Sequence, residues 1–463
     1  MSIFLDRGNL KSDFIVGSHD RGPVYPICHR RRVVRSKHAT ALIASLFLVL
    51  IPASVCSTKW YVNGVTGRDA NDCKSLTSAC KTLGHTLSLA SSGDSIMVAA
   101  ATYKENLTVA IDVSIIGSGA AKTIVDGGGV NRVFVISSGA NVNLSKLTVR
   151  NGYALSGAGI GNSGTLTIKN SVVTANTAHE DCESQTCGND GGGIQNAGTL
   201  TLNNSSVKGN TVSMTGSCPN RCYSVGAGIW NIGTLVINRS TVIGNSASVS
   251  CPRTGHCYSD GGGIHNAGDV GTATISGSTI SGNKSRYGGG IVNGGTLTLT
   301  NSTVSTNSGS GISNTGVSLL INNSTISGNN TDFSMGGGID LVSGTVALQN
   351  SIVANNVANN IPANCNGTVT STGYNLSSDD TCSFNGSGDL NNTDPQLGPL
   401  HNNGGPTQTM ALPSGSPAID AGNPNGCTDS LGNLLKTDQR GKPRPDPEDS
   451  GGCDMGAYER QSE

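Results

Sequence analysis

Residues 191–210 read Gly-Gly-Gly-Ile-Gln-Asn-Ala-Gly-Thr-Leu-Thr-Leu-Asn-Asn-Ser-Ser-Val-Lys-Gly-Asn, and variants of this stretch recur between residues 157 and 356. The isoleucines of successive copies are separated by 34, 35, 35, 27, 21 and 27 residues. They are Ile160, Ile194, Ile229, Ile264, Ile291, Ile312 and Ile339. The shortest step gives a bare repeat of 21 residues, so each longer copy carries one extra loop.

Each repeat holds short apolar runs that alternate with Thr, Ser and Asn, as at Leu200 and Leu202. This two-residue period predicts β-strands, three per repeat. A unit of this size is too small to bury an apolar face alone, so neighbouring units must stack. Each strand then pairs in parallel with its equivalent one coil away, at about 4.8 Å per coil. The sequence therefore predicts an all-β solenoid, a parallel β-helix.

Asparagines at matching turn positions are expected to stack and to hydrogen-bond amide to amide along the solenoid axis. One predicted column consists of Asn176, Asn210, Asn245, Asn283, Asn307, Asn329 and Asn355. A second consists of Asn162, Asn196, Asn231, Asn266, Asn293 and Asn314, and Leu341 interrupts it. The glycines before each repeat isoleucine are expected to supply the positive φ angles of the corner.

The first 57 residues differ in composition from the repeats. A basic stretch, residues 29–37, precedes an apolar run at residues 41–51, which leads to Pro-Ala-Ser-Val-Cys-Ser. This pattern predicts a leader, residues 1–57, with a secretory signal peptide cleaved near Ser57. The run is short for a membrane span, so we expect no transmembrane span in the mature chain. A twin-arginine signal at Arg31-Arg32 and lipidation of Cys56 are alternatives.

The twelve cysteines beyond the leader fall in local pairs. An even set of cysteines in an exported chain predicts disulfides. The expected pairs are Cys73 with Cys80, Cys182 with Cys187, Cys218 with Cys222, Cys251 with Cys257, Cys365 with Cys382, and Cys427 with Cys453. Bridges between successive loops are one alternative. Zinc binding is another, since His179 and His256 lie near cysteines, but no Cys-x-x-Cys motif supports it.

We expect four parts in the chain: the leader, a cap with the first coil at 58–112, the β-helix at 113–358, and an irregular module at 359–463. The cap begins with Trp-Tyr-Val-Asn at residues 60–63 and ends near Tyr-Lys-Glu-Asn-Leu-Thr-Val at 103–109. This sequence resembles the N-terminal segments of pectinesterase-like, right-handed β-helix proteins, and the resemblance implies a right-handed coil. The cap is expected to cover the open strand edge.

Distinctive motifs follow the repeats. They include Gly-Ser-Pro-Ala-Ile-Asp-Ala-Gly at residues 415–422, Thr-Asp-Gln-Arg-Gly at 437–441 and Cys-Asp-Met-Gly-Ala-Tyr-Glu at 453–459. Over residues 365–460 they resemble the choice-of-anchor Q domain of bacterial β-helix surface proteins. The repeats resemble those of polymorphic outer-membrane proteins and of the pectate-lyase-like fold. These resemblances imply an extracellular or cell-surface protein, with association with an outer membrane as one route.

Composition and outward-facing positions limit the chemistry. The formal net charge is −1, and no basic stripe supports nucleic-acid binding. The pectate-lyase resemblance implies that an enzyme would gather several carboxylates around calcium. The positions after the repeat isoleucines hold one carboxylate among Gly161, Gln195, Trp230, His265, Val292, Ser313 and Asp340. A fragment of a hydrolase-like motif, Asn392-Thr393-Asp394, lies outside the repeats. We therefore assign no catalytic residue.

Three long loops, residues 178–190, 211–225 and 246–260, leave the same corner of successive repeats, and each holds a cysteine pair. Loops on a rigid scaffold often carry binding sites, so we expect a platform for a polysaccharide or a cell-surface protein. Its candidate residues are Glu180, Asp181, Glu183, Asp190, Arg221, Tyr223, Trp230, Arg253, His256, Tyr258, Asp260 and His265. The alternative explanation is that the disulfides only stiffen exposed loops.

The rings of Tyr223, Tyr258 and Trp230 are expected to face solvent, where they could stack on sugar faces. The acidic loop residues offer ligands for Ca²⁺, and no other cofactor is expected. The sequence thus predicts an exported, non-catalytic β-helix protein with an adhesive or structural role. The alternative is a polysaccharide lyase or glycoside hydrolase that acts on an acidic polysaccharide.

Overall fold

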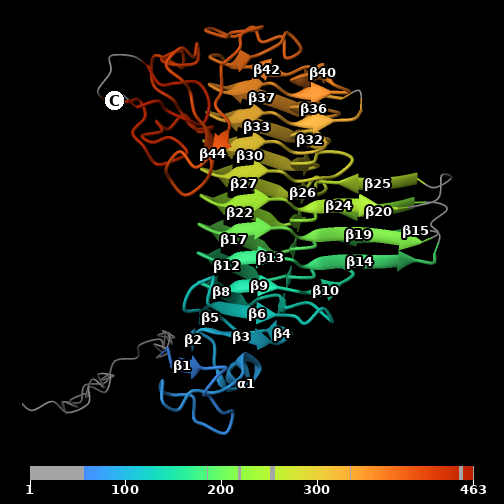
Figure 1. Ribbon diagram of the computed structural model, residues 1–463, viewed down its shortest axis with the longest axis vertical. Helices are drawn as coiled ribbons and strands as arrows, with labels where there is room; N and C mark the ends of the chain where they lie inside the picture. Colours follow the sequence, from blue (N-terminus) through green and yellow to red (C-terminus); the bar gives the residue numbers. More distant parts are fainter. Residues whose placement is uncertain are drawn as a thin grey trace, which may run out of the picture. The chain divides into compact units, whose positions relative to one another are not determined.

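A computed structural model of the protein describes residues 57–184, 186–216, 221–250, 256–333, 335–447 and 452–461. These residues belong to the compact unit Ser57–Glu463, and the predicted signal peptide lies outside them. Short strands follow one another in successive coils, and equivalent strands pair in parallel (Figure 1). The predicted all-β fold, a parallel β-helix, is confirmed. The domain boundaries given above stay predictions.

Three long sheets form the walls of the β-helix. Sheet A consists of β1 (Lys59–Val62), β2 (Asp94–Val98), β5 (Val113–Ile116), β8 (Asn141–Ser145), β12 (Thr165–Lys169), β17 (Thr199–Asn203), β22 (Thr234–Asn238), β27 (Thr272–Ser276), β30 (Thr296–Thr300), β33 (Ser318–Asn322), β37 (Thr345–Gln349) and β42 (Thr370–Ser371). Sheet B consists of β3 (Ala101–Lys104), β6 (Thr123–Asp126), β9 (Thr148–Arg150), β13 (Val172–Thr174), β18 (Ser206–Lys208), β23 (Thr241–Ile243), β28 (Thr279–Ser281), β31 (Thr303–Ser305), β34 (Thr325–Ser327), β38 (Ile352–Ala354) and β43 (Leu376–Ser377). Sheet C consists of β4 (Leu107–Val109), β7 (Phe134–Ile136), β11 (Ile160–Asn162), β16 (Ile194–Asn196), β21 (Ile229–Asn231), β26 (Ile264–Asn266), β29 (Ile291–Asn293), β32 (Ile312–Asn314), β36 (Ile339–Leu341) and β41 (Cys365–Asn366).

Shorter elements lie beside these walls. Sheet D consists of β10 (Tyr153–Ala154), β14 (Thr177–Cys182), β19 (Thr211–Gly216) and β24 (Ser246–Val249), and sheet E of β15 (Thr186–Asp190), β20 (Arg221–Val225) and β25 (His256–Asp260). Two small sheets join β35 (Asn330–Thr331), β39 (Val357–Ala358) and β40 (Ile361–Pro362), and β44 (Leu400–His401) with β45 (Thr409–Met410). The helix α1 (Leu83–Leu89) lies in the cap, where the Thr82 side chain accepts a hydrogen bond from the His85 amide at its N-terminus.

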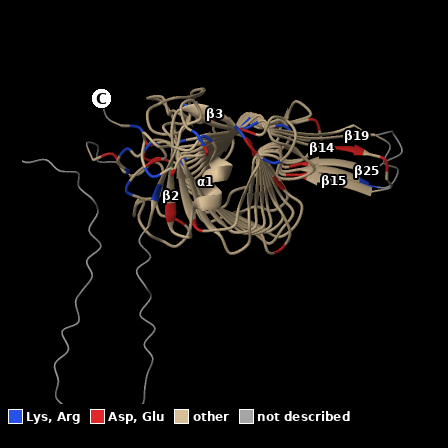
Figure 2. Ribbon diagram, turned by 90° about the horizontal axis from the view of Figure 1, so that it is seen from below, with Lys and Arg blue, Asp and Glu red and all other residues tan. Residues whose placement is uncertain are grey.

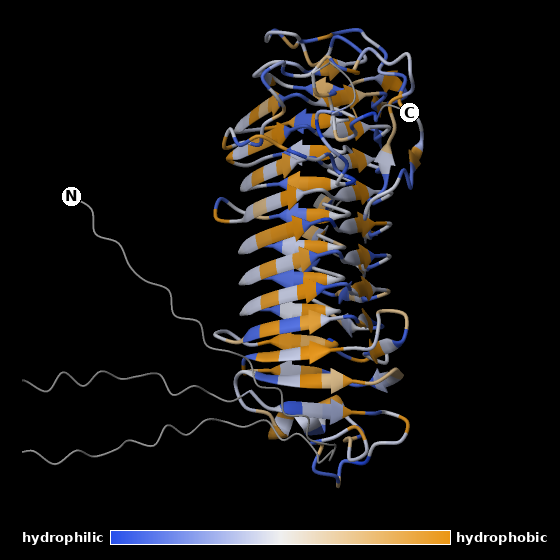
Figure 3. Cartoon of the chain, turned by 90° about the vertical axis from the view of Figure 1, so that its left-hand side faces the viewer, coloured by the Kyte–Doolittle hydropathy of each residue, from blue (hydrophilic) through white to orange (hydrophobic). Residues whose placement is uncertain are grey.

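The interior of the coils is a column of aliphatic side chains. Along β17, Leu200 and Leu202 are fully buried while Thr199 and Thr201 are partly exposed. Figure 3 shows the same alternation of hydrophobic and hydrophilic residues along the stacked strands. The repeat isoleucines of sheet C, such as Ile194 and Ile229, are also fully buried. Burial of one such side chain contributes about 1.5–3 kcal/mol, so stability accumulates coil by coil.

The first asparagine column is confirmed apart from its last member. Each amide nitrogen donates to the next amide oxygen, as from Asn210 to Asn245 at 3.0 Å. Asn329 continues the column to Asn356 at 2.9 Å, so the prediction of Asn355 is wrong. Asn355 has a φ of 58° and an exposed side chain. In each turn the column residue follows a left-handed residue, and Asn355 occupies that left-handed position.

The second column and the corner glycines set the turns of sheet C. The amide of Asn293 donates to that of Asn314 at 2.7 Å, and Leu341 lies opposite Asn314, as predicted. Among the glycines before Ile194, it is the first, Gly191, that has a positive φ of 57°. The last, Gly193, allows close packing instead, because a Cβ there would lie 2.5 Å from the next coil's carbonyl oxygen.

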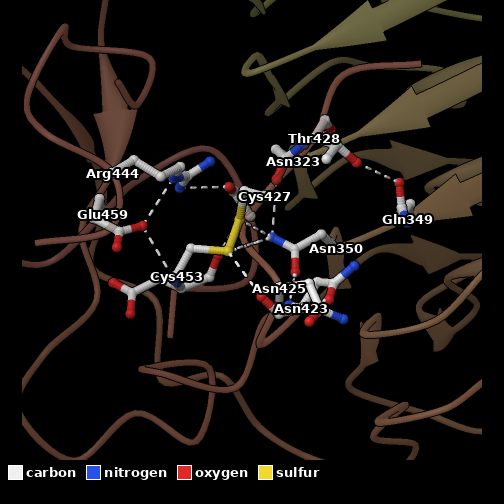
Figure 4. Close-up of a disulfide and its surroundings, with 12 residues drawn as sticks. Asn323, Gln349, Asn350, Asn423, Asn425, Cys427, Thr428, Arg444, Cys453 and Glu459 are labelled. Carbon is white, nitrogen blue, oxygen red and sulfur yellow. Dashed lines mark hydrogen bonds and ion pairs between the residues drawn. A yellow bond between two sulfur atoms is a disulfide. The ribbon is translucent and has the colours of Figure 1, made fainter. Parts of the chain in front are cut away.

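The C-terminal segment packs against the outer side of sheet B, where Gln439 and Ala457 hydrogen-bond to Thr279 and Thr325, and against the turn between β37 and β38. The amide of Asn350 donates to the carbonyl of Asp454 at 3.0 Å, beside the disulfide between Cys427 and Cys453 (Figure 4). Arg444 and Glu459 form an ion pair of 2.8 Å that is buried next to it. The segment therefore covers strand faces that would otherwise meet solvent.

Candidate functional site

The three predicted loops form paired strands that project from the β-helix. In each of three successive coils, one strand of sheet D leads outward and one strand of sheet E leads back (Figure 1). The pairs are β14 with β15, β19 with β20, and β24 with β25, and we call these six strands the arm. Figure 2 shows its two layers from the end of the coils. The loops therefore lie side by side, as predicted, but as two ordered parallel sheets.

The arm has an interior of its own. Ala178, Val212 and Ala247 are register partners in sheet D and are buried. Further out, Met214 packs with the disulfide between Cys182 and Cys187, which joins the two layers. Cys222 and Cys257 are also disulfide-bonded, and their predicted partners lie outside the described residues. The disulfides are thus part of a small apolar core that holds the two layers together.

Sheet E meets sheet C at a sharp corner beside the arm. Val225 ends β20, and the chain reaches Trp230 of β21 within five residues. A Cβ at Gly226 would lie 2.8 Å from the Trp230 Cβ, so only glycine fits this approach. We call the outer surface of this corner the crease. It is formed by Asp190, Val225 and Asp260 of sheet E and by Gln195, Trp230 and His265 of sheet C.

Two tyrosines lie on the outer face of sheet E, next to the crease. Tyr223 and Tyr258 are register partners, and Tyr223 is 36% exposed while Tyr258 is half-buried. The Tyr223 ring lies over Gly188 of the preceding coil, where a Cβ would come within 1.9 Å of it. The Arg221 guanidinium lies 5.8 Å from the centre of the Tyr258 ring. This face therefore presents flat aromatic surface and one cation.

Trp230 and His265 form the opposite side of the crease. Trp230 is half-buried, like Tyr258, because the Gly226 corner packs against one side of it, so its ring is only partly exposed to solvent. His265 Nδ1 is buried and has no hydrogen-bond partner among the described residues. Burial lowers the pKa of His265 to about 4, so its imidazole is neutral at physiological pH.

Two carboxylates lie in the crease, two coils apart. Burial raises the pKa of Asp260 to about 6, although the guanidiniums of Arg221 and Arg286 oppose this shift. Its Oδ1 atom is buried and lacks a hydrogen-bond partner in the described part of the chain. Burial also raises the pKa of Asp190, against the opposing effects of a hydrogen bond from Ser156 and the charge of Arg132. Asp260 can therefore change protonation state near pH 6.

The remaining acidic candidates are not brought together. Asp181 lies on the outer face of sheet D, where hydrogen bonds from Thr215 and His179 lower its pKa. Glu180 pairs in register with the inward-facing Met214, and its Oε2 is buried without a partner among the described atoms. Glu183 is exposed beyond the end of β14. Arg253 lies outside the described residues, as does the side chain of His256.

The cap holds a group of metal-ligating side chains. The one group of three close ligand atoms in the described ranges is Cys73, Cys80 and His85. Its two cysteines form a disulfide, so they cannot act as thiolate ligands. A further disulfide, between Cys365 and Cys382, lies outside both the arm and the Cys427–Cys453 region.

Sequence reasoning missed three residues above the crease. Arg286 and Tyr287 lie in the turn of the next coil, and Tyr287 pairs with Asp260 through an isolated bridge. The ring of Phe333 stacks on that of Tyr287 at 5.6 Å, and the Arg286 guanidinium lies 4.9 Å from the Phe333 ring. These residues lie outside the long loops. The sequence signal that could have placed Arg286 and Tyr287 at this corner is their position directly before the next Gly-Gly-Gly-Ile.

Comparisons with known proteins support the fold. No family model and no curated protein match the chain. Among solved structures, it is similar to the pectate lyase Pel9A, with a TM-score of 0.52 and 14% identity over 88% of this chain and 98% of that one. Partial matches are the pectin methylesterase PemA from Erwinia chrysanthemi (TM-score 0.28, 13% identity, 56% of this chain, 81% of that one) and the GH136 lacto-N-biosidase from Eubacterium ramulus (TM-score 0.30, 11% identity, 65% of this chain, 64% of that one). At these identities the likeness concerns the fold and not the activity.

Within the described ranges, no helix has the length and apolar character needed to cross a membrane.

Proposed function

We propose that the protein is an exported, extracellular β-helix protein that binds a polysaccharide along the crease and does not cleave it. The observation that carries this proposal is the arrangement of Tyr223 and Tyr258 one coil apart on the arm, with Trp230 across the corner. Aromatic rings at a regular spacing offer stacking surfaces to successive sugar units. Because the arm has a disulfide-bonded core, these rings are held in place before a ligand binds.

The extracellular location rests on the disulfides and on the fold. Disulfides persist in oxidising compartments and are rare in the cytosol. The pectate lyase with a similar fold acts on a polysaccharide, as its name says, which makes a glycan the favoured ligand class over a cell-surface protein. An adhesive or structural role, and attachment through a C-terminal choice-of-anchor-like module, are parts of this proposal.

A polysaccharide lyase or glycoside hydrolase is the second candidate. Asp190 and Asp260 favour it, because both carboxyl groups have raised pKa values and lie on the same side of the crease. A proton donor needs a pKa near the working pH, and Asp260 has one. Against it, the crease has no cation positioned between the two carboxylates in the described residues, where Val225 lies instead.

A glycan-array experiment with the mature protein tests the proposal. We expect binding to a polysaccharide, and loss of binding when Tyr223 and Tyr258 are both replaced by alanine, with the melting temperature almost unchanged. Tyr153→Ala is the matched control, since Tyr153 is an exposed tyrosine on β10 of sheet D, outside the arm and the crease. Binding that survives the double replacement would refute the site. Release of shortened or unsaturated products would refute the non-catalytic role.

A further inference from the structure

The end of the crease nearest β29 has the features of a more specific site. Asp260 Oδ1 and His265 Nδ1 are both buried there, and neither has a hydrogen-bond partner among the described residues. Buried polar atoms are nearly always paired, so two unpaired atoms on adjoining strands mark a place where a ligand could supply the partners. At neutral pH an ionised carboxylate and a neutral imidazole can both accept hydrogen bonds, and sugar hydroxyls can donate them.

Two guanidinium groups lie on either side of Asp260 along the crease. Arg221 comes from β20 and Arg286 from the turn before β29, and the charges of both act on the Asp260 carboxyl group. Within the described ranges, neither arginine forms an ion pair with a carboxylate. Both arginines are exposed, so their donors are accessible to a ligand. Arg221 and Arg286 carry two positive charges beside Asp260, and the charges of Lys284 and Asp332 next to Arg286 offset one another, so this end of the crease keeps a surplus of one positive charge.

Flat aromatic rings complete the site. The Tyr258 ring lies beneath Arg221, and the stacked rings of Tyr287 and Phe333 lie beneath Arg286. The site therefore joins cationic donors to apolar surface, a combination that differs from the neutral rings elsewhere on the arm.

We infer, on the basis of the proposed function, that this end of the crease binds an anionic sugar residue, with its carboxylate or sulfate group between Arg221 and Arg286 and its ring against Tyr258. Guanidinium groups bind carboxylates and sulfates with paired, charge-assisted hydrogen bonds. The unpaired atoms of Asp260 and His265 accept hydrogen bonds from hydroxyls of the same sugar. The negative charge of Asp260 also repels the anionic group of the sugar and so limits the affinity for it.

Calorimetric titration of the mature protein tests the inference with three hexasaccharides: one of uronic acid, one sulfated and one of glucose. We expect the uronic or the sulfated ligand to bind at least 10-fold more tightly than the glucose ligand at low salt. Arg221→Gln and Arg286→Gln should each weaken anionic binding about 10-fold and change neutral binding less than 2-fold. Asp260→Asn should tighten anionic binding about 5-fold, because it removes a competing negative charge.

Controls separate this inference from the proposed function. Lys104→Gln on β3 of sheet B removes an exposed cation several coils from the arm and should leave every affinity unchanged. Equal binding of neutral and anionic ligands that still depends on Tyr223 and Tyr258 would overturn the anionic site and keep the proposed function. Absence of binding to any hexasaccharide would overturn both. Equally tight binding of hexaglutamate would overturn sugar recognition, and circular dichroism verifies that each variant is folded.

Discussion

Replacing Asn356 by leucine is expected to cost about 3–5 kcal/mol of unfolding free energy, far more than the same change at Asn355. The Asn356 amide oxygen accepts from the backbone and side-chain nitrogens of Asn329, at 3.0 and 2.9 Å. Its amide nitrogen donates to the carbonyl of Ile326 and to the amide oxygen of Asn364, both at 3.0 Å. All four hydrogen bonds are lost in the variant, and Asn356 is 1% exposed, so water cannot replace them.

The estimate has two parts. The Asn329 backbone N–H loses its partner in the interior, which costs about 1–3 kcal/mol. The other three hydrogen bonds contribute about 0.5–1.5 kcal/mol each, and burial of the leucine offsets part of that loss. Asn355 has an exposed side chain and a left-handed backbone conformation. Leucine there lowers the free energy of unfolding by about 1–2 kcal/mol because of that conformation alone. Urea unfolding followed by far-ultraviolet circular dichroism compares the two variants. Equal shifts, or a larger shift for Asn355→Leu, would refute the assigned column.

Three further perturbations test other parts of the structure. Asp260→Asn should raise the free energy of unfolding at pH 7 by about 2–3 kcal/mol and have little effect at pH 4. Burial raises the pKa of the Asp260 carboxyl group from 3.8 to about 6, so the native state is destabilised as the pH rises through that interval. A stability difference in urea unfolding that does not depend on pH would contradict the assignment. Replacing Cys182 and Cys187 by alanine should lower stability by about 2 kcal/mol, since it removes a loop constraint and opens the arm interior, and an unchanged calorimetric melting temperature would contradict this. Gln439→Leu should speed tryptic cleavage between residues 436 and 444, because the Gln439 amide donates to Thr279 at 2.9 Å and holds the C-terminal segment on sheet B; cleavage at the wild-type rate would show that other contacts suffice.

The repeat fixed much of the architecture in advance because each strand is short, alternating and locally encoded. The alternation at Leu200 and Leu202 predicts a strand with one buried face. The spacing of the repeat isoleucines predicts which strands of the neighbouring coils it pairs with. The error at Asn355 came from two adjacent asparagines. The spacing of the repeats could not show which of the two asparagines is left-handed and which one stacks. In the preceding turns the left-handed residue comes directly before the stacked asparagine, which assigns Asn355 to the first position and Asn356 to the second.

The arm was harder to predict because its strands interrupt the repeat. The alternation of polar and apolar residues at 211–214 is the same as in the repeat strands and predicts a strand. The cysteine pair nearby favoured a disulfide-stiffened loop instead. The site was predictable only in part, since Tyr223 and Tyr258 align through equivalent cysteines. Other members join the site by stacking between coils: Arg286 lies 65 residues from Arg221 in the chain, and Phe333 a further 47 away.

The most direct test of the proposed binding site is a crystal structure of the protein with a bound oligosaccharide at a concentration well above its dissociation constant. The account predicts an intact oligosaccharide that runs along the coil axis between the outer face of β20 and β25 and the outer face of β21 and β26, with sugar rings on Tyr223 and Tyr258. An oligosaccharide bound at sheet A or sheet B, with the crease empty, would contradict the account.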